Sequence, residues 1–244
     1  RVLRGALALG AALPAAAAGG QATIDADHLD LDAWRHALAR MPAEATGGSE
    51  GGYLPANVKL GARSLLVGGR RLSALQLGLQ RLHGEGGEGW RATLESEQAA
   101  GLVEYRETPS GRGAGRLFAR LTRLSLPRSE AEDVESLLDS ASGAVPALDI
   151  VVDDFELRGK RLGRLEVQAV NRGVAAGDAP REWRLTELAL RTPDAVLTGS
   201  GHWAAVPGAA RRRMVLDFKL DLADSGALLE RLGFGKVMSG GKGT

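Results

Sequence analysis

The segment "PALDIVVDDFELRGKRLGRLEVQA" at residues 146–169 has the pattern of two β-strands joined by a tight turn. Apolar residues fill its first half, the glycine-containing basic step RGKR follows, and alternating leucine and valine complete it. The segment "PANVKLGARSLLVGGRRLSALQLGLQ" at residues 55–80 has the same plan, with GGRR at its turn. A Trp-Arg pair follows each segment beyond a polar loop. A strand pair that recurs at a spacing of about ninety residues indicates an architecture extended by repetition.

Strand periodicity dominates the rest of the chain. In MVLDFKLDL at residues 214–222 every second residue is apolar, and the residues between them are mostly charged. Successive side chains of a strand point to opposite faces, so this pattern predicts a sheet with one apolar and one polar face. Short joins that carry glycine, proline or aspartate favour antiparallel hairpins. Further strands are predicted at residues 56–67, 89–96, 100–106, 115–124, 148–157, 182–190 and 195–203.

Helices are few. The apolar spacing in DLDAWRHALARM predicts a helix near residues 31–41, with Asp30 or Asp32 as its N-cap. A thin apolar stripe predicts a second helix at residues 128–145, and DSGALLERLGFG predicts a third that ends at Gly233. These elements divide the chain into a first β module at residues 1–127, a connecting helix at residues 128–145 and a second β module at residues 146–244.

The composition excludes several classes of protein. The 244 residues carry a net charge of +1 with acidic and basic residues interspersed, so nucleic acid is not an expected partner. Cysteine is absent, which excludes disulfides and thiolate metal sites. The opening "RVLRGALALGAALPAAAAGG" has the layout of a secretory signal. Because no initiator methionine precedes it, we instead expect a strand from Val2 to Leu9 and a turn at Pro14, within a piece of a longer protein.

No catalytic or metal-binding constellation stands out. The four aspartates of DADHLDLD at residues 25–32 could hold a hard cation, but helix capping and strand polarity explain them more simply. GEGGEG at residues 84–89 has the glycine spacing of a dinucleotide site, yet a strand-like segment follows it where that site needs a helix. The four histidines share no metal spacing. Asp153 and Asp154 are expected to point to opposite faces of one strand. We therefore predict no enzyme, no cofactor and no metal.

The alternating apolar face is the remaining candidate for a functional feature. One interpretation is that it packs within a sandwich or against the helices. The other is that it stays uncovered, as an open trough that holds an apolar ligand. The sequence pattern leaves both open.

Several stretches carry a resemblance to a known family. Most specific are the Leu-Gly-x-Leu step from Leu162 to Leu165, the Gly-x-Trp strand end from Gly201 to Trp203, and the closing "LLERLGF" and "GGKGT". From Ala22 onward the order and spacing of many such motifs resemble the C-terminal half of the YhdP branch of the AsmA-like proteins, which are large Gram-negative envelope proteins. The stretches that carry the resemblance are "IDADHLDLDAWRHAL", "GLVEYRETPSGRGAGRLFARLTRLSLP", "PALDIVVDDFELRGKRLGRLEVQA", "REWRLTELALRTPDAVLTGSGHW" and "LDFKLDLADSGALLERLGFGKVMSGGKGT".

The resemblance implies a mostly β fold: an extended, twisted antiparallel β-sheet groove built from tandem β-meander repeats with a few short helices. It also implies a periplasmic segment of an inner-membrane-anchored protein, with the anchor outside this chain. Such a protein, similar to the bridge-like lipid transfer proteins, would carry phospholipid between the inner and outer membranes along the apolar groove. Its partners would be phospholipid acyl chains and proteins of the two membranes.

Two further expectations follow. The alternative function is a non-catalytic envelope scaffold that regulates outer-membrane assembly through polar loops such as residues 84–89 and 171–182. For the lipid conduit, the residues expected to line the groove are Leu75, Leu77, Leu79, Leu165, Val167, Leu216, Phe218 and Leu220.

Overall fold

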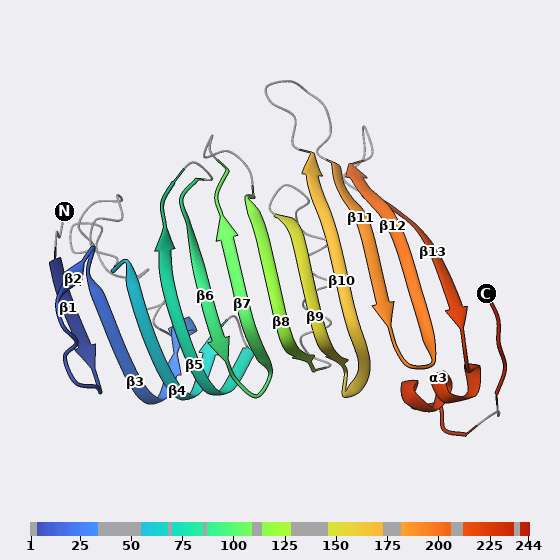
Figure 1. The fold of residues 1–244 in the computed structure, drawn as a ribbon, viewed down its shortest axis with the longest axis horizontal. Coiled ribbons are helices and arrows are strands. Elements are labelled where there is room, and N and C mark those ends of the chain that lie inside the picture. Colours follow the sequence, from blue (N-terminus) through green and yellow to red (C-terminus); the bar gives the residue numbers. More distant parts are fainter. Residues whose placement is uncertain are drawn as a thin grey trace. The chain divides into compact units, whose positions relative to one another are not determined.

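The computed structural model describes residues 4–33, 55–67, 70–84, 87–108, 114–127, 146–172, 182–205, 212–236 and 240–244. These residues form one 13-stranded sheet and the short helix α3 (Figure 1). The elements are β1 (Arg4–Leu9), β2 (Ala17–Ala18), β3 (Gln21–Asp30), β4 (Asn57–Val67), β5 (Arg70–Leu82), β6 (Gly89–Glu95), β7 (Ala99–Arg106), β8 (Arg116–Leu126), β9 (Ala147–Leu157), β10 (Lys160–Arg172), β11 (Glu182–Arg191), β12 (Ala195–Ala205), β13 (Arg212–Leu222) and α3 (Ser225–Leu232).

The hydrogen-bonded order is β13-β12-β11-β10-β9-β8-β7-β6-β5-β4-β3-β1-β2, which is open at both ends. The mostly β, mostly antiparallel fold expected from the sequence is confirmed. Among the pairs with a described register, however, β1 and β3, β3 and β4, and β8 and β9 are parallel. Two parallel strands must be joined by a long crossover connection, because a hairpin turn can join only antiparallel strands. The long connections after β3 and β8 are where the sequence predicts its first two helices.

Those two predicted helices lie mostly outside the described residues. The structure contains the beginning of the first, at Leu31–Ala33, where the backbone N–H of Ala33 donates to Asp30 Oδ1 at 2.8 Å. Asp30 is therefore the N-cap of this helical turn, one of the two expected caps. The predicted helix at residues 128–145 has no described part. At the start of the chain, β1 confirms the expected strand.

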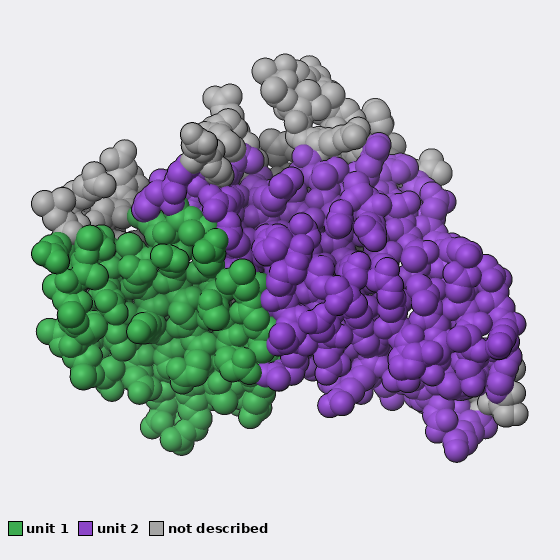
Figure 2. Space-filling view, viewed as in Figure 1, with its two compact units in different colours: residues 1–82, 90–102 green, residues 83–89, 103–244 purple. Residues whose placement is uncertain are grey.

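The chain divides into two compact units (Figure 2). Unit 1 comprises residues 1–82 and 90–102, and unit 2 comprises residues 83–89 and 103–244. The modules expected at residues 1–127 and 146–244 are defined by repetition of sequence, which is a different criterion from compactness. That module boundary stays a prediction.

The repeated segments form equivalent antiparallel hairpins, β4–β5 in unit 1 and β9–β10 in unit 2. In the second hairpin, Leu157 pairs with Lys160 across a two-residue turn. Arg158 has φ of 53° and Gly159 has φ of 77°, the left-handed pair that a type I′ turn requires. Such a turn matches the natural twist of the two strands, so the RGKR step predicted as a turn is one.

A second turn is also repeated. Between β6 and β7, the Ser96 hydroxyl accepts from the backbone N–H of Ala99 at 3.0 Å and donates to its carbonyl at 2.9 Å. Between β11 and β12, the Thr192 hydroxyl makes the same two contacts with Ala195, at 2.9 and 3.2 Å. The hydroxyl thus pairs the backbone N–H of Ala99 or Ala195, and it shares the carbonyl of that residue with the backbone N–H of Ser96 or Thr192. The repetition therefore extends beyond the first hairpin.

Each unit has its own apolar core. In unit 1 the buried residues come from β4 and β5, and half-buried residues of β3 pack against them. In unit 2 they come from β8, β9 and β10, with Val152 fully buried. The core residues are Leu60, Ala62, Leu65 and Leu75 in unit 1, and Ala119, Leu121, Val152, Phe155 and Leu162 in unit 2.

Strict alternation fails at one point of β9. Val152 and Phe155 are both buried, and the two residues between them, Asp153 and Asp154, are both exposed. The expectation that these aspartates point one inward and one outward is therefore wrong. The strand kinks here, so its apolar side chains return to the same face after three residues instead of two. The same apolar-polar-polar-apolar step occurs at residues 26–29 of β3, 62–65 of β4 and 121–124 of β8.

Parallel neighbours kink together, which preserves their register. Leu121 of β8 pairs with Val152 of β9, and Leu124 pairs with Phe155, at the same offset. On the antiparallel side of β9, the strand β10 adapts through Gly163, which pairs with Phe155 and has φ of 82°. Register shifts flank Gly163 on both sides. The Leu-Gly-x-Leu step is thus the place where β10 follows the kink of its neighbour.

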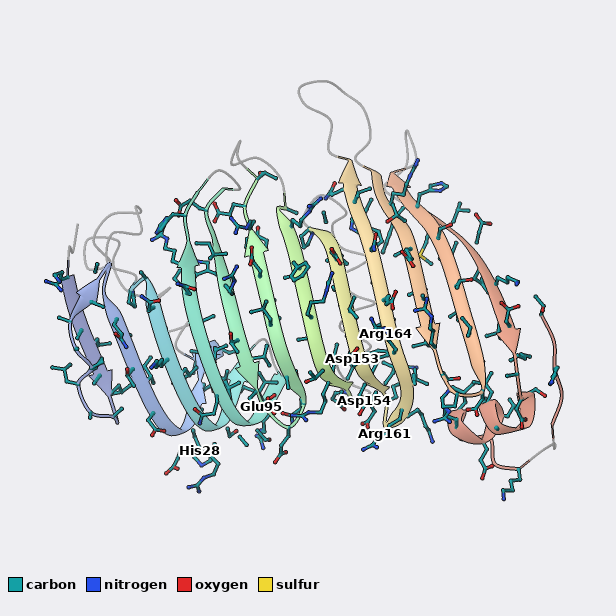
Figure 3. The ribbon with its side chains drawn as sticks, in the orientation of Figure 1. His28, Glu95, Asp153, Asp154, Arg161 and Arg164 are labelled. Carbon is teal, nitrogen blue, oxygen red and sulfur yellow. The ribbon has the colours of Figure 1, made fainter. Side chains whose placement is uncertain are left out.

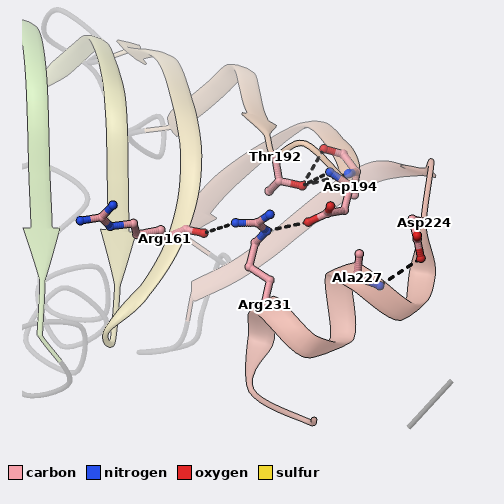
Figure 4. A network of polar contacts seen from close by, with 7 residues as sticks. Arg161, Thr192, Asp194, Asp224, Ala227 and Arg231 are labelled. Atoms are coloured by element: carbon pink, nitrogen blue, oxygen red, sulfur yellow. Dashed lines mark hydrogen bonds and ion pairs between the residues drawn. The ribbon is translucent and has the colours of Figure 1, made fainter. Parts of the chain in front are cut away.

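Helix α3 confirms the third predicted helix. The backbone N–H of Ala227 donates to the Asp224 carboxylate at 3.0 Å, and Gly233 ends the helix with φ of 91°. The Arg231 guanidinium donates to Asp194 Oδ2 in the turn between β11 and β12 at 2.6 Å (Figure 4). A second nitrogen of Arg231 lies 3.5 Å from the carbonyl oxygen of Arg161 in β10. These contacts hold α3 against the strands of unit 2.

Candidate functional site

The registers of unit 2 align apolar residues across four strands. Leu165 of β10 pairs with Leu190 of β11. Leu190 pairs in turn with Leu197 of β12, which pairs with Leu220 of β13. Directly paired residues project from the same face of a sheet. A continuous row of leucines therefore crosses these strands.

A second row runs beside the first. Val167 of β10 pairs with Leu188 of β11. Leu188 pairs with Gly199 of β12, and Gly199 pairs with Phe218 of β13. The five predicted lining residues of unit 2 therefore share one face. We call this surface the apolar face of unit 2; its residues on β10 to β13 are Leu165, Val167, Ala169, Trp183, Leu185, Leu188, Leu190, Ala195, Leu197, Gly199, Gly201, Trp203, Met214, Leu216, Phe218, Leu220 and Leu222.

Several of these residues escaped the prediction from sequence. In β11 the register shifts between Leu185 and Leu188, so the apolar residues of this strand do not alternate. In β12 two inward positions are Gly199 and Gly201, which a search for alternating large residues passes over. The sequence signal that could have identified these positions is the two-residue spacing of the glycines, which continues the alternation of β12. Each glycine pairs with an apolar residue of β13.

The exposure of inward-facing apolar side chains differs between β9 and β13. At β9, Val152 is 0% exposed and is enclosed by its neighbours. At β13, Met214 is 63% exposed, Leu216 40% and Phe218 68%. Large apolar side chains that gather in one exposed patch commonly mark a binding surface. The exposed part of the face therefore lies on β13.

The three predicted lining residues of unit 1 also share a face, and they pair with Ala62, Leu60 and Val58 of β4. Leu77 and Leu79 are half-buried, whereas Leu75 is 1% exposed and belongs to the core of unit 1. Contact of any of these residues with a ligand stays a prediction.

The opposite face of unit 2 is largely polar and carries a chain of ion pairs. Arg164 contacts Asp153 at 2.6 Å and Glu166 at 2.7 Å, and Glu166 also contacts Arg191 at 2.9 Å. Figure 3 labels Asp153 on β9 and Arg164 on the adjacent strand β10. The hydrogen bond from Arg164 lowers the pKa of Glu166, with smaller contributions from Arg191, and the same bond raises the pKa of Arg164. The two faces therefore differ in chemistry.

A cavity of about 490 Å³ opens where the register of β11 shifts. Its lining consists largely of polar-face residues of β11, β12 and β13. Three of its lining residues, Leu188, Gly199 and Phe218, occupy positions of the apolar face, so the cavity is lined by residues of both faces. The lining residues are Thr186, Glu187, Leu188, Thr198, Gly199, Ser200, Asp217, Phe218 and Lys219.

The acidic segment at residues 25–32 has structural contacts. Asp27 pairs with Arg63 at 3.0 Å on the exposed side of the β3 kink, and Asp30 caps the helical turn after β3. Across the described ranges, no three histidine or acidic side chains come together as metal ligands would. GEGGEG leads into the strand β6, so no helix begins there to hold a phosphate.

The comparison with protein families decides the assignment. The model of the family described as YhdP protein matches residues 1–244. The chain belongs to the YhdP family. Neither the curated proteins nor the solved structures contain a match. Membership of this family of cell-envelope proteins suggests a role related to lipid transport. Within the described part of the chain, no helix has the length and apolar character that crossing a bilayer requires.

Proposed function

We propose that this chain is a segment of a non-enzymatic, periplasm-spanning conduit that carries phospholipid between the inner and outer membranes, with acyl chains lying on the apolar face. One observation carries the proposal: the leucine row and the row beside it lead without interruption to exposed apolar side chains on β13. The family assignment supports a lipid as the occupant.

Apolar contact suits transport because it is not directional. Each methylene that leaves water for an apolar surface contributes about 0.8 kcal/mol. This contribution depends on the area buried and hardly on the position of the chain along the surface. An acyl chain can therefore move along rows of similar side chains without a single tight site to leave. Conduction of this kind requires no catalytic residue.

Placing a carboxylate on the apolar face tests the proposal. The variant Phe218→Asp changes an exposed position, so we expect little loss of fold stability. An unpaired charge beside hydrocarbon is strongly unfavourable, so we expect lipid binding to fall at least tenfold. The measurement is native mass spectrometry of the chain purified from a Gram-negative periplasm, with lipid extraction from the same sample. Circular dichroism verifies the fold.

Val215→Asp is the matched control, because Val215 lies on the same strand and pairs with His202 on the polar face. It introduces the same charge one residue away, and we expect it to retain lipid. A well-folded wild-type chain that carries no lipid would refute the conduit for this segment and favour the scaffold function. Equal loss of lipid in both variants would refute the assignment of the face.

A further inference from the structure

We propose that the outer edge of β13 docks an extended segment of a partner protein, which adds to the sheet as a further antiparallel strand and carries a basic residue opposite Asp217. We call the side of β13 that faces away from β12 the β13 edge. The inference goes beyond the proposed function, because it concerns the backbone edge of the sheet and not the apolar face. It starts from the place of β13 as the last strand in the hydrogen-bonded order, with β12 as its strand neighbour.

The backbone groups that point out of the β13 edge belong to its apolar residues. The N–H of Leu222 donates to the carbonyl oxygen of Gly243 at 2.7 Å, and the N–H of Gly243 donates to that of Leu222 at 3.2 Å. Leu222 therefore points its backbone groups away from β12. These groups alternate in direction along a strand, and the register of β12 with β13 has no shift. The residues that point the same way are Met214, Leu216, Phe218 and Leu220.

The edge is covered at one end only. Beside Leu222, the segment 240–244 lies against it, and the Thr244 hydroxyl donates to Asp221 Oδ1 at 3.1 Å. From residue 214 to residue 220, no described residue bonds to the outward backbone groups. A row of unpaired N–H and carbonyl groups is a template for another strand. An added strand would bond to this row, and its own apolar residues would continue the apolar face.

A second copy of β13 fits the edge poorly. In a two-fold antiparallel pair, outward-pointing residues must lie opposite one another, so the axis passes through one residue position. Three positions of the axis keep most of the apolar residues paired. An axis at Phe218 places Met214 of the other copy opposite Leu222, where Gly243 already lies.

The two remaining positions of the axis bring like charges together. An axis at Asp217 places this carboxylate opposite its own copy. An axis at Leu216 places Lys219 opposite residue 213, which is also basic. Like charges directly opposite one another are destabilising in a sheet. The β13 edge is therefore open to a strand of different sequence and unfavourable for its own.

The polar side of the edge favours a basic residue in the partner. Lys219 is already paired with Asp221 at 2.9 Å. Asp217 is exposed, and within the described part of the chain it has no hydrogen-bond or ion-pair partner. A lysine or arginine opposite Asp217 would complete a cross-strand ion pair. The residues on either side of that basic residue would lie opposite Leu216 and Phe218, so they are expected to be apolar.

Synthetic peptides test the proposal on the chain of residues 1–244. The probe is a heptapeptide with a central lysine, valine at its first, third, fifth and seventh positions, and threonine at the other two. In the proposed register the lysine lies opposite Asp217. Two matched probes are methylated on backbone nitrogen, one at its inner valines and the other at its threonines. Fluorescence anisotropy measures binding, and hydrogen exchange followed by NMR measures the protection of each backbone N–H.

We expect the unmodified probe to bind and to slow exchange at Leu216 and Phe218, whose N–H groups point outward. Exchange at Val215 should change little, because its N–H already points toward β12. Methylation of the valines should weaken binding by about tenfold or more, since it removes the donors that face β13, whereas methylation of the threonines should be tolerated.

Reversal of charge tests the register. A probe with glutamate in place of lysine should bind about three to ten times more weakly. The variant Asp217→Lys should reverse this preference, so that the glutamate probe binds more tightly than the lysine probe. This substitution lies on the polar face and is exposed, so we expect it to leave the fold unchanged.

Each failure has a distinct meaning. Equal binding of the two methylated probes would overturn the proposal, because apolar contact and not backbone pairing would then hold the peptide. An unchanged charge preference in Asp217→Lys would overturn it too, as would absence of binding by every probe at millimolar concentration. A stable dimer in analytical ultracentrifugation that the probe does not dissociate would show that a second copy occupies the edge. None of these results measures lipid binding, which the Phe218→Asp experiment tests separately.

Discussion

Gly163 is the residue through which β10 follows the kink of β9, and replacing it with alanine should be costly. Its φ of 82° lies in the left-handed region, where an L-residue costs about 1–2 kcal/mol. A Cβ at this position would lie 2.4 Å from the carbonyl oxygen of Arg191. Arg191 is paired with β10 on one side and β12 on the other, so its backbone cannot withdraw easily. Overpacking of this kind costs about 1–3 kcal/mol.

The sum predicts that Gly163→Ala destabilises the chain by about 2–5 kcal/mol, against a typical total of about 5–15 kcal/mol. Gly159 provides a matched control. Its φ is 77°, but nothing lies within 4 Å of where its Cβ would be. Gly159→Ala should therefore cost only the backbone part, about 1–2 kcal/mol.

Urea unfolding followed by circular dichroism measures both variants. We expect Gly163→Ala to lower the free energy of unfolding by about 1–3 kcal/mol more than Gly159→Ala, with an unchanged dependence on urea. Equal losses would refute the reasoning, because the contact with Arg191 would then have no energetic weight. A stable Gly163→Ala variant would also show that β10 can follow the kink without a glycine.

Two further predictions concern the polar contacts of unit 2. The pKa of Glu166 is lower in the folded chain than in the unfolded chain, because Glu166 pairs with Arg164. The pairing therefore stabilises the fold at pH values above the unfolded carboxyl pKa of about 4.3. This stabilisation is lost as the pH falls through the folded pKa. The stability difference between wild type and Glu166→Gln, measured by urea unfolding, should therefore shrink toward zero in acid; a difference independent of pH would contradict this. Arg231→Ala removes the contact with Asp194 and should cost about 1–3 kcal/mol and speed amide hydrogen exchange in α3. Arg161→Ala should leave that exchange unchanged, because Arg161 offers Arg231 only its backbone carbonyl; similar rates in both variants would show that the ion pair does not hold the helix.

The sequence predicted much of the local structure because local signals were strong. Alternation in β13 fixed which of its residues share a face, and the RGKR step fixed the hairpin between β9 and β10. The cap at Asp30 and the helix end at Gly233 were predicted for the same reason, since capping depends on residues only a few positions apart. Strand alternation also identified Leu216, Phe218 and Leu220 as residues of one face.

The sequence did not predict which strands pair with one another across long connections. The parallel contacts of β3 with β4 and of β8 with β9 join strands separated by long connections, and no local pattern specifies the partner of a strand. The kink at Asp153 and Asp154 reversed an inference from alternation, since the strand returns its apolar side chains to one face after three residues. The core position of Leu75 likewise depends on neighbours from other strands.

The sequence by itself determined the repeated strand pair, the two-faced chemistry of the strands and the family, because these depend on residue order and on local geometry. Only the tertiary structure decided where the apolar face is buried and where it is exposed. Exposure is set by which strands are neighbours and by the registers between them. Val152 and Phe218 look alike as apolar residues in alternating strands, yet one is enclosed at the kink and the other lies open beside Gly199.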